Sequence, residues 1–158
     1  MPKISAILHT HNDEQRIARA LESLRACNEI VVIDHDSSDQ TAEVARRHGA
    51  QVKPSVPGVQ PGAYVNDLQN DWVLCLQPNE AISEALEASL FEWKQEEVPQ
   101  EIVGYSVAVR EETENGWRND GQHLRLANRK RINWPERLPP VNGDGHVLAG
   151  ELLRFSKP

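Results

Sequence analysis

Short apolar runs alternate with polar clusters and helical patterns along the first hundred residues of the chain. The apolar runs cover residues 4–8, 30–33 and 72–76, and a weaker one begins at Val52. They show no in-out alternation, which is typical of parallel strands covered on both faces. Apolar residues recur every three or four positions in 17–24 and 83–94, which predicts amphipathic helices. Strand and helix in turn predict an α/β fold with a mostly parallel central sheet.

Local signals predict where some of these helices begin and end. Ser83 precedes a helical pattern and is a typical N-cap residue, and a second helix is expected to begin at Thr41. Gly49 follows that second helix as an expected left-handed C-cap. A shorter helix is expected over 63–68, after the turn-rich loop 58–62.

The pattern changes after residue 100. Residues 102–109 alternate between apolar and small or polar side chains, as a half-exposed strand does. Shorter strands are expected over 124–126 and 147–155, which together predict a mixed or antiparallel C-terminal extension of the sheet. The length of 158 residues suits one domain, with 1–98 and 99–158 as its halves.

The charge balance narrows the classes of partner. A net charge of -7 argues against non-specific binding to nucleic acid, because phosphate backbones bind clustered Lys and Arg. The arginine-rich stretch 125–137 is either solvated surface or a patch that faces a nucleotide or lipid phosphate. Peripheral membrane contact therefore stays open, although no apolar run approaches the length of a membrane span.

The two cysteines, Cys27 and Cys75, lie in apolar surroundings without redox or zinc spacing. The chain also opens directly on a strand-like run rather than on a signal peptide. Both features favour a cytoplasmic protein.

Four motifs occur in order along the first half of the chain. They are Thr-His-Asn-Asp-Glu at 10–14, Leu-Glu-Ser-Leu at 21–24, Glu-Ile-Val-Val-Ile-Asp-His-Asp-Ser-Ser-Asp-Gln-Thr at 29–41 and Asp-Trp-Val-Leu at 71–74. Together they resemble the family 2 glycosyltransferases, with the nearest likeness to the bacterial subgroup that decorates lipopolysaccharide cores. The resemblance implies the GT-A fold, a nucleotide-sugar donor and a glycan or lipid-linked acceptor.

The resemblance also implies where the nucleotide would bind. Thr10 and Asn12 would line its pocket, and Asp34 would accept hydrogen bonds from uracil or ribose. Leu124-Arg125-Leu126 and Arg129 resemble the family's Leu-Arg-Leu-Phe-Arg-Arg strand, and Arg125 and Arg129 are the candidates to contact the diphosphate. The full predicted nucleotide-binding set is Thr10, Asn12, Asp34, Asp36, Arg125 and Arg129. In this reading 1–98 is the nucleotide-binding half and 99–158 the acceptor half.

The residues that would carry catalysis depart from the family pattern. Family members hold Mg²⁺ or Mn²⁺ with an Asp-x-Asp motif, where this chain has Gln77-Pro78-Asn79 followed by Glu80. Asn79 and Glu80 are the remaining candidate metal ligands, and Glu80 or Asp120 the candidate base. An alternative reading of Glu80 is an acid that favours the dipole of the following helix.

Two further positions depart from the same pattern. Pro61-Gly62 replaces a basic residue and an asparagine, and Leu138-Pro139-Pro140 stands where the subgroup often has His-Glu. Proline offers no proton acceptor and no backbone donor.

Other kinds of site remain open at this point. His9, His11 and His35 could bind a transition metal together with Asp34 and Asp36. The chain lacks the Gly-x-Ser-x-Gly elbow of α/β hydrolases. Among the tryptophans, Trp117 and Trp134 lie in polar loops and could stack on an acceptor sugar, whereas Trp72 and Trp93 have core spacing.

Two hypotheses follow from the sequence. One is an active glycosyltransferase with an unusual, metal-free site. The other is a glycosyltransferase-like protein without transferase activity, which acts as a binding or partner module.

Overall fold

A computed structural model of the protein describes residues 1–134 and 146–158. The elements follow one another as β1 (Ile4–Thr10), α1 (Ile17–Glu22), β2 (Glu29–Asp34), α2 (Thr41–Arg47), β3 (Gln51–Pro54), the 3-10 helix η1 (Pro61–Asp67), β4 (Trp72–Cys75), β5 (Glu80–Ile82), α3 (Glu84–Trp93), β6 (Gly104–Thr113), β7 (Gly116–Asn128) and β8 (Val147–Arg154). No helix within the described residues is both long and apolar enough to span a membrane.

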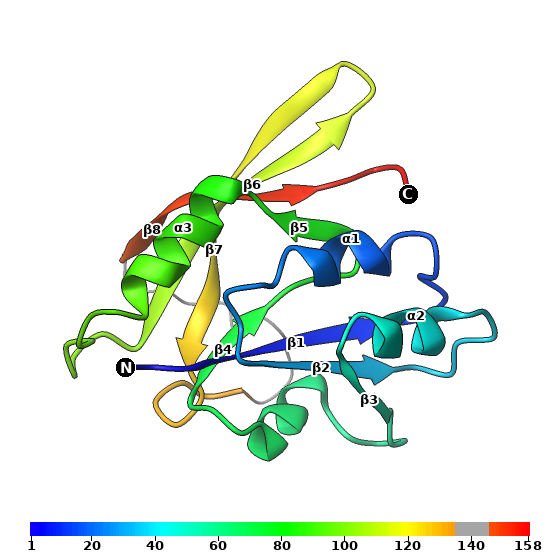
Figure 1. Ribbon diagram of the computed structural model, residues 1–158, viewed down its shortest axis with the longest axis horizontal. Helices are drawn as coiled ribbons and strands as arrows, with labels where there is room; N and C mark the ends of the chain where they lie inside the picture. Colours follow the sequence, from blue (N-terminus) through cyan, green and yellow to red (C-terminus); the bar gives the residue numbers. More distant parts are fainter. Residues whose placement is uncertain (135–145) are drawn as a thin grey trace.

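The strands of the described residues form one eight-stranded sheet in the order β3-β2-β1-β4-β7-β6-β8-β5 (Figure 1). β1 pairs in parallel with β2 and β4, and β2 pairs in parallel with β3. β7 runs antiparallel to β4 and β6, while β8 is parallel to β6 and antiparallel to β5. The predicted parallel sheet with a mixed extension is confirmed.

Apolar side chains on both faces of the central strands explain why their sequence does not alternate. Ile4, Ala6 and Leu8 of β1 join the core under α1, α2 and α3. Ile7 points to the other face, where it packs with Val65 of η1. A strand covered in this way has no solvent-facing side that needs polar residues.

The predicted helix ends agree with the structure where the sequence carried a clear signal. The Ser83 side chain accepts a hydrogen bond from the Leu86 backbone N–H, and α2 begins at Thr41. Gly49 has a φ of 84°, as the left-handed residue after a helix requires.

Two predicted elements need correction. Glu80 was read as an acid ahead of a helix, but it begins β5, which pairs with β8. The strand expected over 124–126 is only the buried end of β7, which forms a long hairpin with β6 that extends away from the other elements (Figure 1). The outer part of this hairpin is largely exposed, so it carries no apolar pattern that would reveal a strand.

The close approach of β8 to α3 yields a stability prediction. Gly150 has a φ of 104°, and a Cβ there would lie 2.3 Å from the Leu86 backbone nitrogen. Gly116 has a similar φ of 117° with no atom within 4 Å of such a Cβ. We expect Gly116→Ala to cost about 1–2 kcal/mol for its backbone conformation alone. Gly150→Ala should cost about 1–3 kcal/mol more because of the overlap.

Urea unfolding of the two variants measures this difference directly. Equal losses of unfolding free energy would mean that α3 does not pack against β8 at Gly150.

Candidate functional site

The carboxyl ends of the parallel strands bring the predicted nucleotide-binding loops together. Thr10 at the end of β1 lies opposite Asp34 at the end of β2. β2 lies on one side of β1 and β4 on the other, so the order of the strands reverses beside β1. Ligands of open α/β sheets bind outside the carboxyl ends of the strands at such a reversal.

Hydrogen bonds between the two loops hold them in one arrangement. The Asn12 backbone donates to Ser37 Oγ (2.9 Å), and the Ser38 backbone donates to Asn12 Oδ1 (2.8 Å). Ser37 Oγ in turn donates to Asp34 Oδ1 (2.5 Å). Asn12 has a φ of 53°, and its place in this bonded loop offsets the strain of that conformation.

Asp34 keeps one side of its carboxylate open. Its side chain is half-buried, and Oδ2 has no hydrogen-bond partner among the described residues. Asp36 in the same loop is exposed, with a φ of 52°. Thr10, in contrast, is buried and donates its hydroxyl to Asp13 (2.6 Å), so it shapes the loop from below.

A pair of histidines lies beside these loops. His9 Nδ1 and His35 Nε2 are 2.8 Å apart, and the His9 ring meets Tyr64 edge to face. Burial, with a further contribution from His35, lowers the pKa of His9 to about 4, so this ring is neutral at neutral pH. His11 lies outside the pair and bonds through Nδ1 to the His35 carbonyl (2.6 Å). Within 1–134 and 146–158, no three or more His, Cys, Asp or Glu side chains gather to hold a metal ion.

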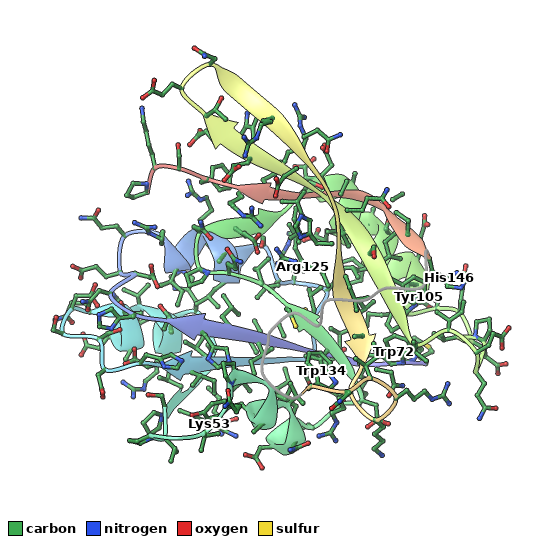
Figure 2. The ribbon with its side chains drawn as sticks, turned by 180° about the vertical axis from the view of Figure 1, so that it is seen from behind. Lys53, Trp72, Tyr105, Arg125, Trp134 and His146 are labelled. Carbon is green, nitrogen blue, oxygen red and sulfur yellow. The ribbon has the colours of Figure 1, made fainter. Side chains whose placement is uncertain are left out.

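Glu80 and Arg125 form a buried ion pair behind the loop that follows β4. Arg125 Nη1 lies 2.6 Å from Glu80 Oε1, and Nη2 lies 2.8 Å from Oε2. The exposed fractions are 0% for Glu80 and 1% for Arg125, whose side chain extends from β7 into the interior (Figure 2). Arg154 also bonds Glu80 Oε2 (3.1 Å), and the Gln77 backbone donates to Oε1 (2.9 Å). Both carboxylate oxygens are therefore engaged inside the protein.

This geometry changes the expected roles of both residues. Glu80 was a candidate base and metal ligand, but it is fully buried and bonded to two guanidinium groups. Arg125 was a candidate for the diphosphate, but both of its Nη atoms bond Glu80, and Nη1 also bonds the Cys75 carbonyl (3.1 Å). In this arrangement the two residues hold the loop in place and do not face a ligand.

A divalent cation does not fit the residues at this loop. Gln77 and Asn79 offer neutral amides, which supply no charge for Mg²⁺ or Mn²⁺. Glu80 is the nearest carboxylate in the sequence, and its oxygens are committed to Arg125, Arg154 and the loop backbone. The arrangement thus gives no support to Asn79 and Glu80 as a metal site.

Arg129 lies at the amino ends of the parallel strands, whereas Asp34 lies at their carboxyl ends. Its backbone N–H donates to the carbonyl of Asp71, just before β4 begins. Its Nη1 donates to the carbonyls of Val65 (2.9 Å) and Asn66 (3.0 Å), which fastens η1 to the end of β7. The prediction that Arg129 contacts the diphosphate is therefore corrected. Arg129 lies beside the start of β4, whereas Asp34 lies at the ends of the parallel strands, so the two residues do not share a ligand.

The other predicted residues of the second half are partly placed. Asp120 Oδ2 bonds Arg154 Nη1 (3.1 Å), so it joins the Glu80 network. Trp134 is 8% exposed and packs in the core with Val65 of η1, so it does not form a stacking platform for a sugar. Trp117 is 40% exposed and meets Phe155 edge to face. Arg137 and the Leu138-Pro139-Pro140 segment lie outside the described residues.

The sequence interpretation missed Arg154 and His123. Arg154 is the one cation of β8 and directly follows two leucines, which is the signal that could have indicated a buried partner. His123 lies beside Asp120 in space and gave no motif at all.

A separate groove of about 580 Å³ lies between η1 and the end of β7. Its lining includes Gln60, Asn66, Arg129 and Trp134. Thr10, Asn12, Asp34 and Asp36 are not part of it, so it is distinct from the loops at the carboxyl edge.

The family model that matches this chain covers the same loops. Residues 5–59, which contain β1, β2 and the polar loops after them, match the family described as Glycosyl transferase family 2. An uncharacterized glycosyltransferase of Rickettsia typhi is 37% identical over 91 residues, which cover 55% of this chain and 31% of that protein. A 4,4'-diaponeurosporenoate glycosyltransferase of Staphylococcus haemolyticus is 44% identical over 52 residues, which cover 31% of this chain and 14% of that protein. This chain therefore matches about a third or less of the length of these relatives.

Solved structures show the same fold at low sequence identity. Mannosyl-3-phosphoglycerate synthase from Rubrobacter xylanophilus aligns with a TM-score of 0.55 at 23% identity, over 72% of this chain and 42% of that one. Glucosyl-3-phosphoglycerate synthase from Mycobacterium tuberculosis, in complex with Mn²⁺, UDP and glucosyl-3-phosphoglycerate, aligns with a TM-score of 0.51 at 18% identity, over 70% and 43%. The predicted GT-A fold is confirmed.

The buried ion pair predicts a large effect of one neutral substitution. Glu80→Gln should destabilise the protein by about 3–5 kcal/mol, because it leaves buried guanidinium charge uncompensated. Glu87 is a matched control, since it makes a two-bond contact to Arg25, whose side chain is 73% exposed. Glu87→Gln should cost less than about 1 kcal/mol. Chemical denaturation at neutral pH compares the two; similar losses would show that the Glu80 pair is open to water.

Proposed function

We propose that this chain is a glycosyltransferase of family 2 that binds a nucleotide sugar at the loops after β1 and β2. We propose further that it transfers the sugar to a glycan or lipid-linked acceptor. The observation that carries the proposal is the bonded arrangement of Asn12, Ser37 and Ser38 around Asp34, in which Asp34 Oδ2 has no hydrogen-bond partner in the described part of the chain. The family match over 5–59 supports it, because it covers the same loops.

Asp34 suits the nucleoside part of such a donor. An ionised carboxylate only accepts hydrogen bonds, and uracil and ribose offer N–H and O–H donors. Because Asn12 and Ser37 hold the loop in advance, little ordering would be needed on binding. UDP is the nucleotide in the Mycobacterium tuberculosis structure, which makes it the first candidate for this chain.

The reaction is a direct displacement of the nucleoside diphosphate by an acceptor hydroxyl. The diphosphate needs its growing charge offset, and the acceptor needs a base. Since the loop at 77–80 does not fit a cation, we propose that this chain binds its nucleotide without a divalent metal. The backbone N–H groups of residues 11–13 already bond within these loops, whereas those of Asp36 and Ser37 have no partner among the described residues and are the donors available to the nucleotide.

Finer assignments extend the same proposal. The likeness of the motifs to the lipopolysaccharide-core subgroup favours a sugar acceptor on a bacterial envelope glycan. Both cysteines are free thiols, and burial raises the pKa of each to about 12, so they are inert and suit a cytoplasmic setting.

A second candidate function is binding without transfer. The neutral Gln77 and Asn79 side chains and the engaged Glu80 favour it, because these positions carry charge-handling groups in the family that the chain resembles. Such a protein would keep the nucleotide site and act as a partner or sensing module.

Calorimetric titration with UDP, GDP and their sugars tests nucleotide binding. We expect binding of at least one nucleotide, with the same affinity in the presence and absence of Mn²⁺. Asp34→Asn should weaken it by about 10- to 100-fold, since a hydrogen bond to a charged group contributes about 1.5–3 kcal/mol. Asp67→Asn, at the exposed end of η1, is the control and should leave affinity unchanged. Failure of every nucleotide to bind would refute the proposal.

Restoring the missing carboxylates gives a second test. The double variant Gln77→Asp with Asn79→Asp should raise affinity for Mn²⁺, because two anionic oxygens then replace two amides. Electron paramagnetic resonance of free and bound Mn²⁺ measures the change. Unchanged affinity would mean that the 77–79 loop does not face the nucleotide site.

A further inference from the structure

One imidazole lies at the outer end of the buried charge network. The Arg154 guanidinium bonds both Glu80 Oε2 (3.1 Å) and Asp120 Oδ2 (3.1 Å). His123 Nε2 lies 3.4 Å from the same Asp120 oxygen. Direct contacts therefore run without a break from the Gln77 backbone through Glu80, Arg154 and Asp120 to His123.

The backbone brings Asp120 and His123 together by a local irregularity. Gly121 between them has a φ of 79°, and the pairing of β6 with β7 shifts register between Ala108 and Arg110. Bulges of this kind redirect side chains and are common beside active sites. His123 lies opposite Val107, which is fully buried, so its side chain lies on the inner face of the hairpin.

The hydrogen bond of His123 fixes which of its nitrogens is free. Nε2 lies 3.0 Å from the Asp120 carbonyl oxygen, which can only accept. Nε2 must therefore carry the proton, and in the neutral ring Nδ1 carries the lone pair. Nδ1 has no partner within the described part of the chain, and the side chain is 36% exposed.

The remaining acids of the network are less suited to take up a proton. Glu80 is fully buried with both oxygens engaged. Asp120 already bonds Arg154 and faces His123, which suits a residue that orients the ring. Asp120 Oδ1 also has no partner among the described residues, and the Asp120 side chain is 31% exposed, but an imidazole accepts a proton more readily than a carboxylate does near neutral pH.

We propose that His123 is the general base of the transfer reaction and that Asp120 is its positioning residue. The acceptor hydroxyl oxygen forms a bond to the anomeric carbon of the donor sugar as its proton passes to His123 Nδ1. The bond between that carbon and the diphosphate oxygen breaks, and the nucleoside diphosphate leaves with the electron pair. Imidazole is the side chain that most often serves as such a base.

This inference rests on the proposed function, so its test begins with the unaltered protein. UDP-glucose, UDP-N-acetylglucosamine and GDP-mannose are supplied as donors with water as the acceptor, and release of UDP or GDP is followed. We expect His123→Gln to lower kcat by about 100-fold or more, as loss of a general base does, with KM for the donor unchanged. Gln122→Ala on the opposite face of β7 is the control and should keep the full rate.

Two further variants separate chemistry from folding. Added imidazole should restore activity to His123→Ala but not to Asp34→Asn, because only the first lacks a proton acceptor. Asp120→Asn should lower kcat without changing the KM for the donor, since it removes the negative charge that stabilises the His123 ring once it has taken up the proton.

The possible outcomes separate the proposal of His123 as the base from the proposed transfer function. A full rate in His123→Gln would overturn His123 as the base and leave transfer standing. Nucleotide binding without turnover in the unaltered protein would overturn both the base and the transfer reaction and leave the binding module. Absence of both binding and turnover would overturn the proposed function itself.

Discussion

Two opposite charges, on Glu80 and Arg125, meet where water does not reach them. Desolvating each is costly, and the cost is offset only because the guanidinium and the carboxylate make two short bonds with further partners around them. The pair joins strands that are distant in the sequence, since Glu80 begins β5, Arg125 belongs to β7 and Arg154 ends β8. It also bonds the backbone of the 77–80 loop. The position of that loop depends on this interaction.

The same interaction decides what chemistry the edge of the sheet can perform. A carboxylate that neutralises buried arginines is not available to a cation, and its neighbours Gln77 and Asn79 carry no charge. Nucleotide recognition is therefore proposed for the loops after β1 and β2, where Asp34 Oδ2 has no partner among the described residues. Proton transfer is proposed for His123, which lies at the partly exposed end of the network.

The sequence predicted the half of the molecule in which local pattern and tertiary structure agree. The apolar runs form the parallel strands. Ser83, Thr41 and Gly49 mark helix ends, because each of these signals depends only on residues close to it in the sequence. The fold class and the place of Asn12 and Asp34 at one edge followed from these elements. Contacts between segments that are distant in the sequence were not predictable in this way. Nothing near Glu80 in the sequence indicates that Arg125 and Arg154 bond it. Trp134 lies in a polar stretch of the sequence but packs into the core.

A direct test of a metal-free nucleotide site is an NMR titration of the amide-labelled protein with UDP in the presence of a chelator. Amide shifts of 10–13 and 34–38 are expected to move together and saturate, while those of the groove between η1 and β7 stay in place. Shift changes confined to that groove, or changes at 10–13 and 34–38 that occur only after Mn²⁺ is added, would contradict the assignment.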